Sequence, residues 1–317
     1  MKILQISKPV LPIGKDMKYG GIERVIRDLD MMYTKEGHES YVVAPANSEI
    51  SGTLIPSING GAWVGTQEGI YDEQKKEEAL KRHTMIALDA IRKINPDVIH
   101  DHLPIIMRDQ YLKNPPKIPM LTTIHGSLQS ENGMSSIPNP FPKTIYPFNH
   151  FNSISESQRQ FFSNYIPIGF NVYNAVSVSD YPFEEKKRDY LLSLGKIGLN
   201  KGQDTAIKLT RSLGKKLIIA GPVHAFRGPI KEFWENKIKP HIDETHLNMS
   251  ASEINKFTKD FSEKDFGYKG RVAYLGEVDD SQKKELFKHA SGFLMPIRWH
   301  EPFGLVMIES MATGTPV

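Results

Sequence analysis

The stretch from Ile297 to Glu309 reads IRWHEPFGLVMIE and places two carboxylates around a Pro-Phe-Gly turn. Glu301 precedes the turn, and Glu309 lies inside the apolar run that follows it. We expect a helix over 304–312 with its start near Pro302, because proline suits the first helical position. The first amides of a helix favour anions. The stretch therefore predicts acidic side chains and outward-pointing amides at one helix start.

Strands and helices alternate on both sides of this stretch. Continuous apolar strands of this kind are typical of a parallel sheet that is covered by helices on both faces. We expect strands at 3–6, 40–45, 97–102, 119–125, 150–155, 190–195, 216–221, 272–277 and 292–297, and helices after Gly21 and over 72–94, 201–212, 229–242, 281–290 and 304–312.

A polar, proline-containing segment at 179–190 is predicted to link two doubly wound units. The first would comprise residues 1–182 and the second residues 183–317. Residues 243–270 are rich in Lys, Asp and Glu and are interpreted as a surface insertion. The second unit reaches Val317 where a further strand would be expected to begin, so we expect this unit to be incomplete.

Composition excludes several classes of protein. The chain has 317 residues, of which 39% are hydrophobic and 24% charged, and it contains no cysteine. Disulfides, thiolate catalysis and cysteine-containing zinc sites are therefore excluded. No apolar run approaches the roughly 18 residues of a membrane span, and the N-terminus is not a signal peptide, so a cytoplasmic location is expected.

The charge distribution favours a small anionic ligand over nucleic acid. A net charge of +3 is too small to indicate a nucleic-acid partner. Residues 186–317 nevertheless hold 22 Lys and Arg against 16 Asp and Glu. A basic second half suits an anion there, although unevenly scattered surface lysines explain the same count equally well.

The common nucleotide and hydrolase fingerprints are missing. The sequence has no G-x-G-x-x-G after its first strand, no P-loop and no G-x-S-x-G elbow. His100, Asp101 and His102 resemble a metal site at a strand end. On a strand, however, the two histidines point to one side and Asp101 to the other, which leaves only two ligands. We therefore predict no metal site.

Two other places suit phosphate. Gly20 and Gly21 open a helix after a strand and a loop, and glycine lets backbone amides approach a ligand closely. A flexible turn explains the same pair equally well. Lys196 follows a strand, and Lys201 is expected in a first helical turn, where a cation opposes the helix dipole unless an anion lies between them.

The start of that second helix has a predicted cap. Asn200 would cap the helix, with Gln203 at the third position of a capping box. Lys201 would then lie beside the free amides of the first turn.

The residues at these places resemble a known family. EPFGLVMIE is similar to the E-x₇-E motif of retaining glycosyltransferases with the GT-B fold, of the family-four type. The other stretches that carry the resemblance occur in the family's order over nearly the whole chain: GGIERVIRDL, GHES, DVIHDH, TIHG, SISESQ, VYNAVSV, LGKIGLNKG, LGEVDD and MATGTPV. Family members continue beyond GTPV, so the resemblance implies a chain that lacks its C-terminal end.

The resemblance implies two Rossmann-like domains that face each other across a cleft, with the acceptor on the first and the nucleotide-sugar donor on the second. It places His125 and Glu301 at the transferred sugar as catalytic residues. For His125 the alternative is a strand-end histidine bonded to backbone. The donor-binding residues that it implies are Gly20, Gly21, Lys196, Lys201, Phe303, Gly304, Leu305 and Glu309.

Within that donor set, the resemblance assigns Glu309 to the ribose hydroxyls and the others to the diphosphate. The family commonly has Arg at the position of Lys196, so this chain keeps the charge and loses the bidentate fork. No metal and no cofactor is required in such enzymes. The leaving phosphate itself takes the proton of the acceptor during front-face attack.

The expected function is therefore transfer of a sugar from a nucleotide-diphosphate sugar to a hydroxyl acceptor, with retention. The acceptor is a saccharide, a lipid-linked glycan at a membrane face or a small molecule, and loops 51–71 and 126–149 are expected to select it. Polysaccharide biosynthesis is a common setting for the family. One alternative is an inactive or partner-completed nucleotide-binding fragment, and a second is a dehydrogenase.

Overall fold

A computed structural model describes the chain except residues 16, 19, 60–72, 127–146 and 224–227. The chain folds into two compact units, Met1–Asn174 and Ala175–Val317. The expected acceptor loops at 51–71 and 126–149 lie largely outside the described residues.

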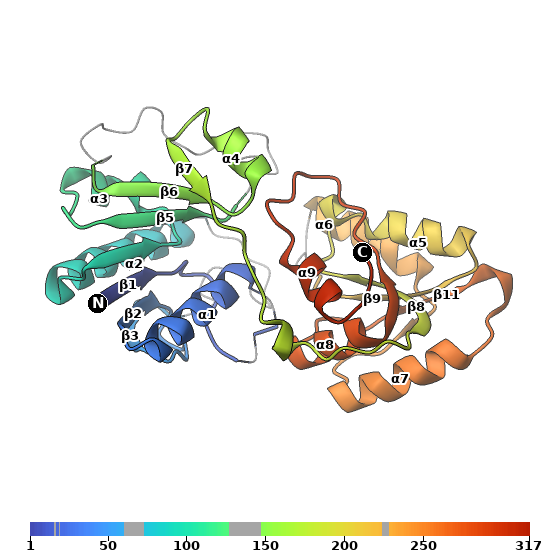
Figure 1. The fold of residues 1–317 in the computed structure, drawn as a ribbon. Coiled ribbons are helices and arrows are strands. Elements are labelled where there is room, and N and C mark those ends of the chain that lie inside the picture. Colours follow the sequence, from blue (N-terminus) through green and yellow to red (C-terminus); the bar gives the residue numbers. More distant parts are fainter. Residues whose placement is uncertain (16, 19, 60–72, 127–146, 224–227) are drawn as a thin grey trace. The chain divides into compact units, whose positions relative to one another are not determined.

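The first unit contains a seven-stranded parallel sheet among its described residues, in the order β3-β2-β1-β4-β5-β6-β7 (Figure 1). The strands expected from the sequence are present, and β3 and β7 are added at the two edges. Its elements are β1 (Lys2–Ile6), α1 (Gly21–Lys35), β2 (Glu39–Ala44), β3 (Thr53–Pro56), α2 (Glu73–Ile94), β4 (Val98–Asp101), α3 (Asp109–Lys113), β5 (Met120–Ile124), β6 (Asn149–Ser153), α4 (Glu156–Phe162) and β7 (Ile168–Asn171).

Helices cover both faces of this sheet because successive strand residues point to opposite sides. On β2, Val43 belongs to the larger core cluster with residues of α2 such as Ile91. Its neighbours Val42 and Ala44 pack with Ile26 of α1 on the opposite face. The continuous apolar strands of the sequence thus reflect burial on two sides.

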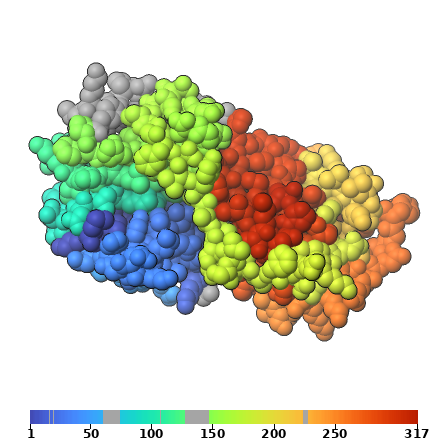
Figure 2. Space-filling model, in the orientation of Figure 1, coloured from blue at the N-terminus to red at the C-terminus, as the bar shows by residue number. Residues whose placement is uncertain are grey.

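The second unit contains a five-stranded parallel sheet among its described residues, in the order β10-β11-β9-β8-β12. The C-terminal segment forms part of this unit's surface in Figure 2, where it is red. Its elements are β8 (Arg188–Leu194), α5 (Gln203–Ser212), β9 (Lys216–Ala220), α6 (Gly228–Phe233), β10 (Glu244–Thr245), α7 (Ala251–Glu263), β11 (Arg271–Tyr274), α8 (Asp280–His289), β12 (Ala290–Phe293) and α9 (Leu305–Ala312).

The interpretation of residues 243–270 as a surface insertion is wrong. They contain β10, which pairs with β11, and helix α7, which starts in a capping box made by Ser250 and Glu253. Ile254 and Phe261 of α7 are almost fully buried in the same core cluster as residues of α8. This segment therefore supplies one of the layers that cover the sheet, while α5 and α6 cover the other face.

The division between the units falls after Asn174, earlier than the expected limit at residue 182. The reason is that the segment after Asn174 is bound to the second unit. Tyr181 donates its hydroxyl to Glu309 Oε1 over 3.1 Å, and Lys284 Nζ lies 5.0 Å from the centre of the Tyr181 ring. The bonds continue beyond residue 182, since Lys187 donates to the carbonyl oxygens of Lys288 and Thr313, both at 2.8 Å.

Candidate functional site

The strand order of the second unit reverses between β8 and β12. From β8 the chain moves through β9 toward one edge of the sheet and later returns to add β12 on the other side. In such sheets ligands bind at the carboxyl ends of the strands where the order reverses. Lys196 and Lys201 follow β8, and Glu301 follows β12. Lys196, Lys201 and Glu301 thus lie on the chain segments that leave this edge of the sheet.

Lys201 and Glu301 form an ion pair at this edge. Lys201 Nζ lies 3.0 Å from Glu301 Oε2, and it also lies 4.6 Å from the centre of the Trp299 ring. The two charged side chains are 26% and 17% exposed. An ammonium group has three donors, so this pair leaves Lys201 able to donate to a further acceptor.

Lys196 is held through its backbone. Its carbonyl oxygen accepts a bond of 3.0 Å from Gln203 Nε2, and the residue is half-buried. Within the described part of the chain, its ammonium group has no hydrogen-bond or ion-pair partner. The loop therefore fixes the position of Lys196 and leaves its charge available.

The capping box predicted at Asn200 is wrong. Helix α5 begins at Gln203 and its N-cap is Gly202, with φ of 71°. A Cβ at Gly202 would lie 2.0 Å from the carbonyl oxygen of Pro296, so only glycine fits there. Lys201 lies in the short 3₁₀ turn before the helix, and the Gln203 side chain binds the loop at Lys196.

The helix after the Pro-Phe-Gly turn begins later than Pro302. Helix α9 starts at Leu305, and its N-cap Gly304 adopts φ of 83° and ψ of 57°. Pro302 is buried outside the helix, so the prediction that it starts the helix is wrong. Of Phe303, Gly304 and Leu305, only Leu305 supplies a helical amide. The left-handed glycine replaces proline as the residue that turns the chain into the helix.

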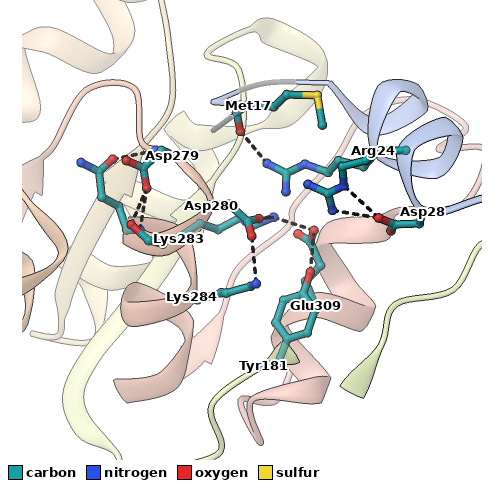
Figure 3. A network of polar contacts seen from close by, with 12 residues as sticks. Met17, Arg24, Asp28, Tyr181, Asp279, Asp280, Lys283, Lys284 and Glu309 are labelled. Carbon is teal, nitrogen blue, oxygen red and sulfur yellow. Dashed lines mark hydrogen bonds and ion pairs between the residues drawn. The ribbon is translucent and has the colours of Figure 1, made fainter. Parts of the chain in front are cut away.

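Glu309 lies on α9 as predicted, but it is buried in a network that the sequence did not reveal (Figure 3). Its carboxylate is held by Lys283 of α8, whose Nζ lies 2.6 Å from Oε1. Tyr181 donates its hydroxyl to the same oxygen over 3.1 Å. Both bonds converge on Oε1, and Oε2 accepts none from the described residues.

The network continues along the first turns of α8. Asp280 binds Lys283 over 3.2 Å and Lys284 over 2.9 Å, and Lys284 Nζ lies 5.0 Å from the centre of the Tyr181 ring. Figure 3 shows these side chains around Glu309. Asp280 thereby fixes the two lysines, and the lysines fix Glu309 and Tyr181.

The strand order of the first unit reverses in the same way between β1 and β4. Gly21 is the first residue of α1, and Gly20 precedes it with φ of 131°. A Cβ at Gly20 would lie 2.8 Å from Glu23 Oε2. Glu23 is 5% exposed, and burial raises its pKa. Burial lowers the pKa of Lys8, which follows β1, although the carboxylates of Glu23 and Asp101 oppose this shift.

Three histidines gather at the same edge of the first unit. His100 and His102 lie at the end of β4 with ring centres 4.0 Å apart, and His125 follows β5. His102 Nδ1 lies 2.9 Å from His125 Nε2. Burial lowers the pKa of His125 to about 3 and that of His100 to about 4, so the cluster is neutral near pH 7. Among the described residues, the His125 ring is bonded to a side chain and not to backbone.

Asp101 points away from these histidines, as its place on a strand predicted. Its carboxylate accepts from the amides of Leu103 and Ile105, both over 2.9 Å, and from Thr122 Oγ1 over 3.1 Å. Burial raises the pKa of Asp101 to about 7. Among the described residues, no group of three His, Asp or Glu side chains could hold a metal ion. In the same residues, no helix is long and apolar enough to cross a membrane.

Both units are similar in sequence to known glycosyltransferases. Residues 19–165 match the family model Glycosyltransferase Family 4, and residues 180–317 match the model Glycosyl transferases group 1. Mannosylfructose-phosphate synthase of Agrobacterium fabrum is 28% identical over 163 residues, which cover 48% of this chain and 31% of that enzyme. The match thus spans about a third of that curated relative's length.

Solved structures share the fold of both units. Sucrose-phosphate synthase of Thermosynechococcus elongatus superposes with a TM-score of 0.69 at 16% identity, over 99% of this chain and 80% of that one. HepE of Anabaena, crystallised with UDP and glucose, has a TM-score of 0.63 at 14% identity, over 100% of this chain and 80% of that one. The chain therefore consists of two glycosyltransferase domains with the GT-B fold.

Proposed function

We propose that the protein transfers a sugar from a nucleotide-diphosphate sugar to a hydroxyl group of its acceptor, with retention of the anomeric configuration and without a metal ion. The observation that carries this proposal is the gathering of Lys196, Lys201 and Glu301 at the carboxyl ends of β8 and β12, in a domain that matches a glycosyltransferase family model. A GT-B relative crystallised with UDP and glucose supports UDP-sugars as the first donors to test.

The diphosphate would be held by positive charge and amides. Lys196 has an unpaired ammonium group within the described chain, and Lys201 keeps donors free beside Glu301. Hydrogen bonds from a cation to phosphate are roughly twice as strong as neutral ones. The amides of Phe303, Gly304 and Leu305 are proposed to add to this site, with Gly20 and Gly21 as further donor contacts.

The two carboxylates would hold hydroxyl groups. Glu309 is proposed to accept from ribose hydroxyls through Oε2, because Lys283 and Tyr181 both occupy Oε1. Glu301 is proposed to contact hydroxyls of the transferred sugar, and its bond to Lys201 keeps it beside the phosphate site. His125 is proposed to lie at the sugar as a hydrogen-bonding group.

The mechanism follows from these charges. As the bond from the sugar to the diphosphate breaks, negative charge grows on the leaving phosphate, and fixed cations stabilise that charge. Lys196 and Lys201 would supply this stabilisation without a metal. The acceptor hydroxyl would attack from the side of the leaving group, and the leaving phosphate would take its proton. A saccharide, a lipid-linked glycan or a small molecule would serve as acceptor.

The experiment is a transfer and hydrolysis assay of the chain with UDP-, GDP- and ADP-sugars, with and without EDTA. We expect one donor to react, the rate to survive EDTA, and proton NMR to show the donor's anomeric configuration in the product. An inverted product or complete loss in EDTA would contradict the mechanism. Nucleotide binding without turnover would support the alternative, a nucleotide-binding fragment that requires further sequence or a partner.

A further inference from the structure

We propose that His102 is a positioning residue that fixes His125 in the tautomer with its proton on Nδ1, so that His125 presents an N–H donor from its second nitrogen. The placement of that donor at a substrate rests on the proposed function. The tautomer itself rests on the hydrogen bonds of the first unit alone.

The bond between the two rings allows two arrangements. His102 Nδ1 and His125 Nε2 lie 2.9 Å apart, so one nitrogen donates and the other accepts. A neutral imidazole carries one proton, on one of its two nitrogens. If His102 donates from Nδ1, His125 accepts at Nε2 and its own proton is on Nδ1. If His125 donates from Nε2, its Nδ1 is a bare acceptor.

The surroundings of His102 distinguish these arrangements. His102 is fully buried, and its Nε2 has no hydrogen-bond partner among the described residues. The second arrangement would put the His102 proton on this Nε2 and leave a buried N–H without an acceptor. An orphaned buried N–H is rarer than an under-used acceptor. The first arrangement leaves only a lone pair there.

Neighbouring His100 is fixed independently and does not compete for the bond. Thr123 donates its hydroxyl to Asn152 Oδ1 over 2.7 Å, so it must accept at 2.8 Å from His100 Nε2. The His100 ring then packs against His102 with centres 4.0 Å apart. His100, Thr123 and Asn152 lie on β4, β5 and β6, so three neighbouring strands fix the His100 ring beside His102.

Both rings are neutral under working conditions. Burial lowers the pKa of His125 to about 3 and that of His102 well below its usual value. A His125 that stays neutral with its proton on Nδ1 is a hydrogen-bond donor to a sugar oxygen, not a general base. His102 would therefore decide which role His125 can take.

The test is long-range proton–nitrogen NMR of the ¹⁵N-histidine-labelled chain at neutral pH, without substrate. His125→Asn identifies the His125 signals, and exposed His150 serves as a reference for free exchange between tautomers. We expect His125 Nδ1 to be protonated and Nε2 bare. In His102→Phe the His125 signals should move toward those of His150. In His102→Asn, whose amide can donate from nearly the same place, they should stay as in the wild type.

Activity provides the second readout. If a nucleotide sugar is turned over, His102→Phe should lower kcat/KM about tenfold, as expected for loss of one well-placed hydrogen bond, and His102→Asn should recover most of it. A protonated Nε2 on wild-type His125, or a tautomer unchanged in His102→Phe, would overturn the inference. If His102→Phe does not fold, the wild-type and His102→Asn spectra test the inference, and His125 should be protonated on Nδ1 in both. The expected tautomer in a chain without turnover would refute only the proposed function.

Discussion

Lys283 Nζ lies 2.6 Å from Glu309 Oε1, and the two side chains are only 8% and 6% exposed. One comes from α8 and the other from α9, so the pair ties together two helices beside the proposed donor site. Such a pair is costly to break on one side, because the remaining charge stays buried without its partner.

Removing one partner of this pair should destabilise the chain. Lys283→Met should lower the free energy of unfolding by about 3–5 kcal/mol, and Glu309→Gln should also destabilise the chain. The double variant should lose less than the sum of the two, because no charge is then left alone. Urea unfolding of the four proteins measures the coupling. Additive losses would mean that the pair does not hold the helices together.

Tyr181 offers a milder change at the same carboxylate. Tyr181→Phe keeps the ring, removes the 3.1 Å hydrogen bond to Glu309 Oε1 and should reduce stability by about 1 kcal/mol. If Glu309 binds ribose hydroxyls, nucleotide affinity should fall while affinity for a 2′,3′-dideoxy nucleotide stays the same. Calorimetry with both nucleotides checks this. Equal losses would show that Tyr181 does not act through the ribose contact.

Gly20 should not tolerate a side chain. Gly20→Ala would place a Cβ 2.8 Å from Glu23 Oε2 at φ of 131°, and strain of this kind costs on the order of 1–3 kcal/mol. Gly14→Ala is the matched control, since nothing lies within 4 Å of its added Cβ. Thermal unfolding of both variants tests the difference. A Gly20→Ala protein as stable as Gly14→Ala would contradict the geometry.

The buried His83 should contribute an acid-sensitive part of the first unit's stability. This histidine is fully buried, contacts Ser57 Oγ and the Ser7 carbonyl oxygen, and burial lowers its pKa to about 4. The unfolded chain binds a proton below about pH 6.5 and the folded chain only near pH 4, so stability falls as pH drops through this window, by up to about 3 kcal/mol.

Asp101 opposes this pH dependence, so the contribution of His83 is measured as the difference between the wild type and a His83 variant. The raised pKa of Asp101, about 7, acts in the opposite sense, because the folded chain then holds its proton at a pH where the unfolded chain has lost it. His83→Gln keeps a donor for Ser7 and should reduce the loss between pH 6.5 and 4. His150→Gln, an exposed histidine, should leave the profile unchanged. Urea unfolding at a series of pH values measures both.

The sequence predicted the two parallel sheets because fully buried strands are continuously apolar, and this signal is local. It also predicted that Lys196 and Lys201 follow a strand of the second unit and that Glu301 precedes its last helix. The pair between Lys283 and Glu309 left no such signal, because partners on different helices have no fixed spacing. Gly202 was missed as the N-cap of α5 for a related reason: a long-range approach to the Pro296 carbonyl oxygen requires it.

Helix α7 is a different kind of error. Ile254, Phe257 and Phe261 recur at helical spacing and follow a Ser–Glu capping box, so the signal for a packed helix was present. The surrounding charged residues concealed it. Composition alone indicated a surface insertion, whereas periodicity would have predicted the helix.

The central claim is that Lys196 and Lys201 hold a nucleoside diphosphate, and calorimetric titration of UDP, GDP and ADP tests it most directly. One nucleotide should bind at a single site to the wild-type chain, with affinity reduced about tenfold or more in Lys196→Ala. Lys215→Ala, an exposed lysine of the same unit, should bind as the wild type does. Failure of all three nucleotides to bind, or equal affinity in Lys196→Ala and Lys215→Ala, would contradict the claim.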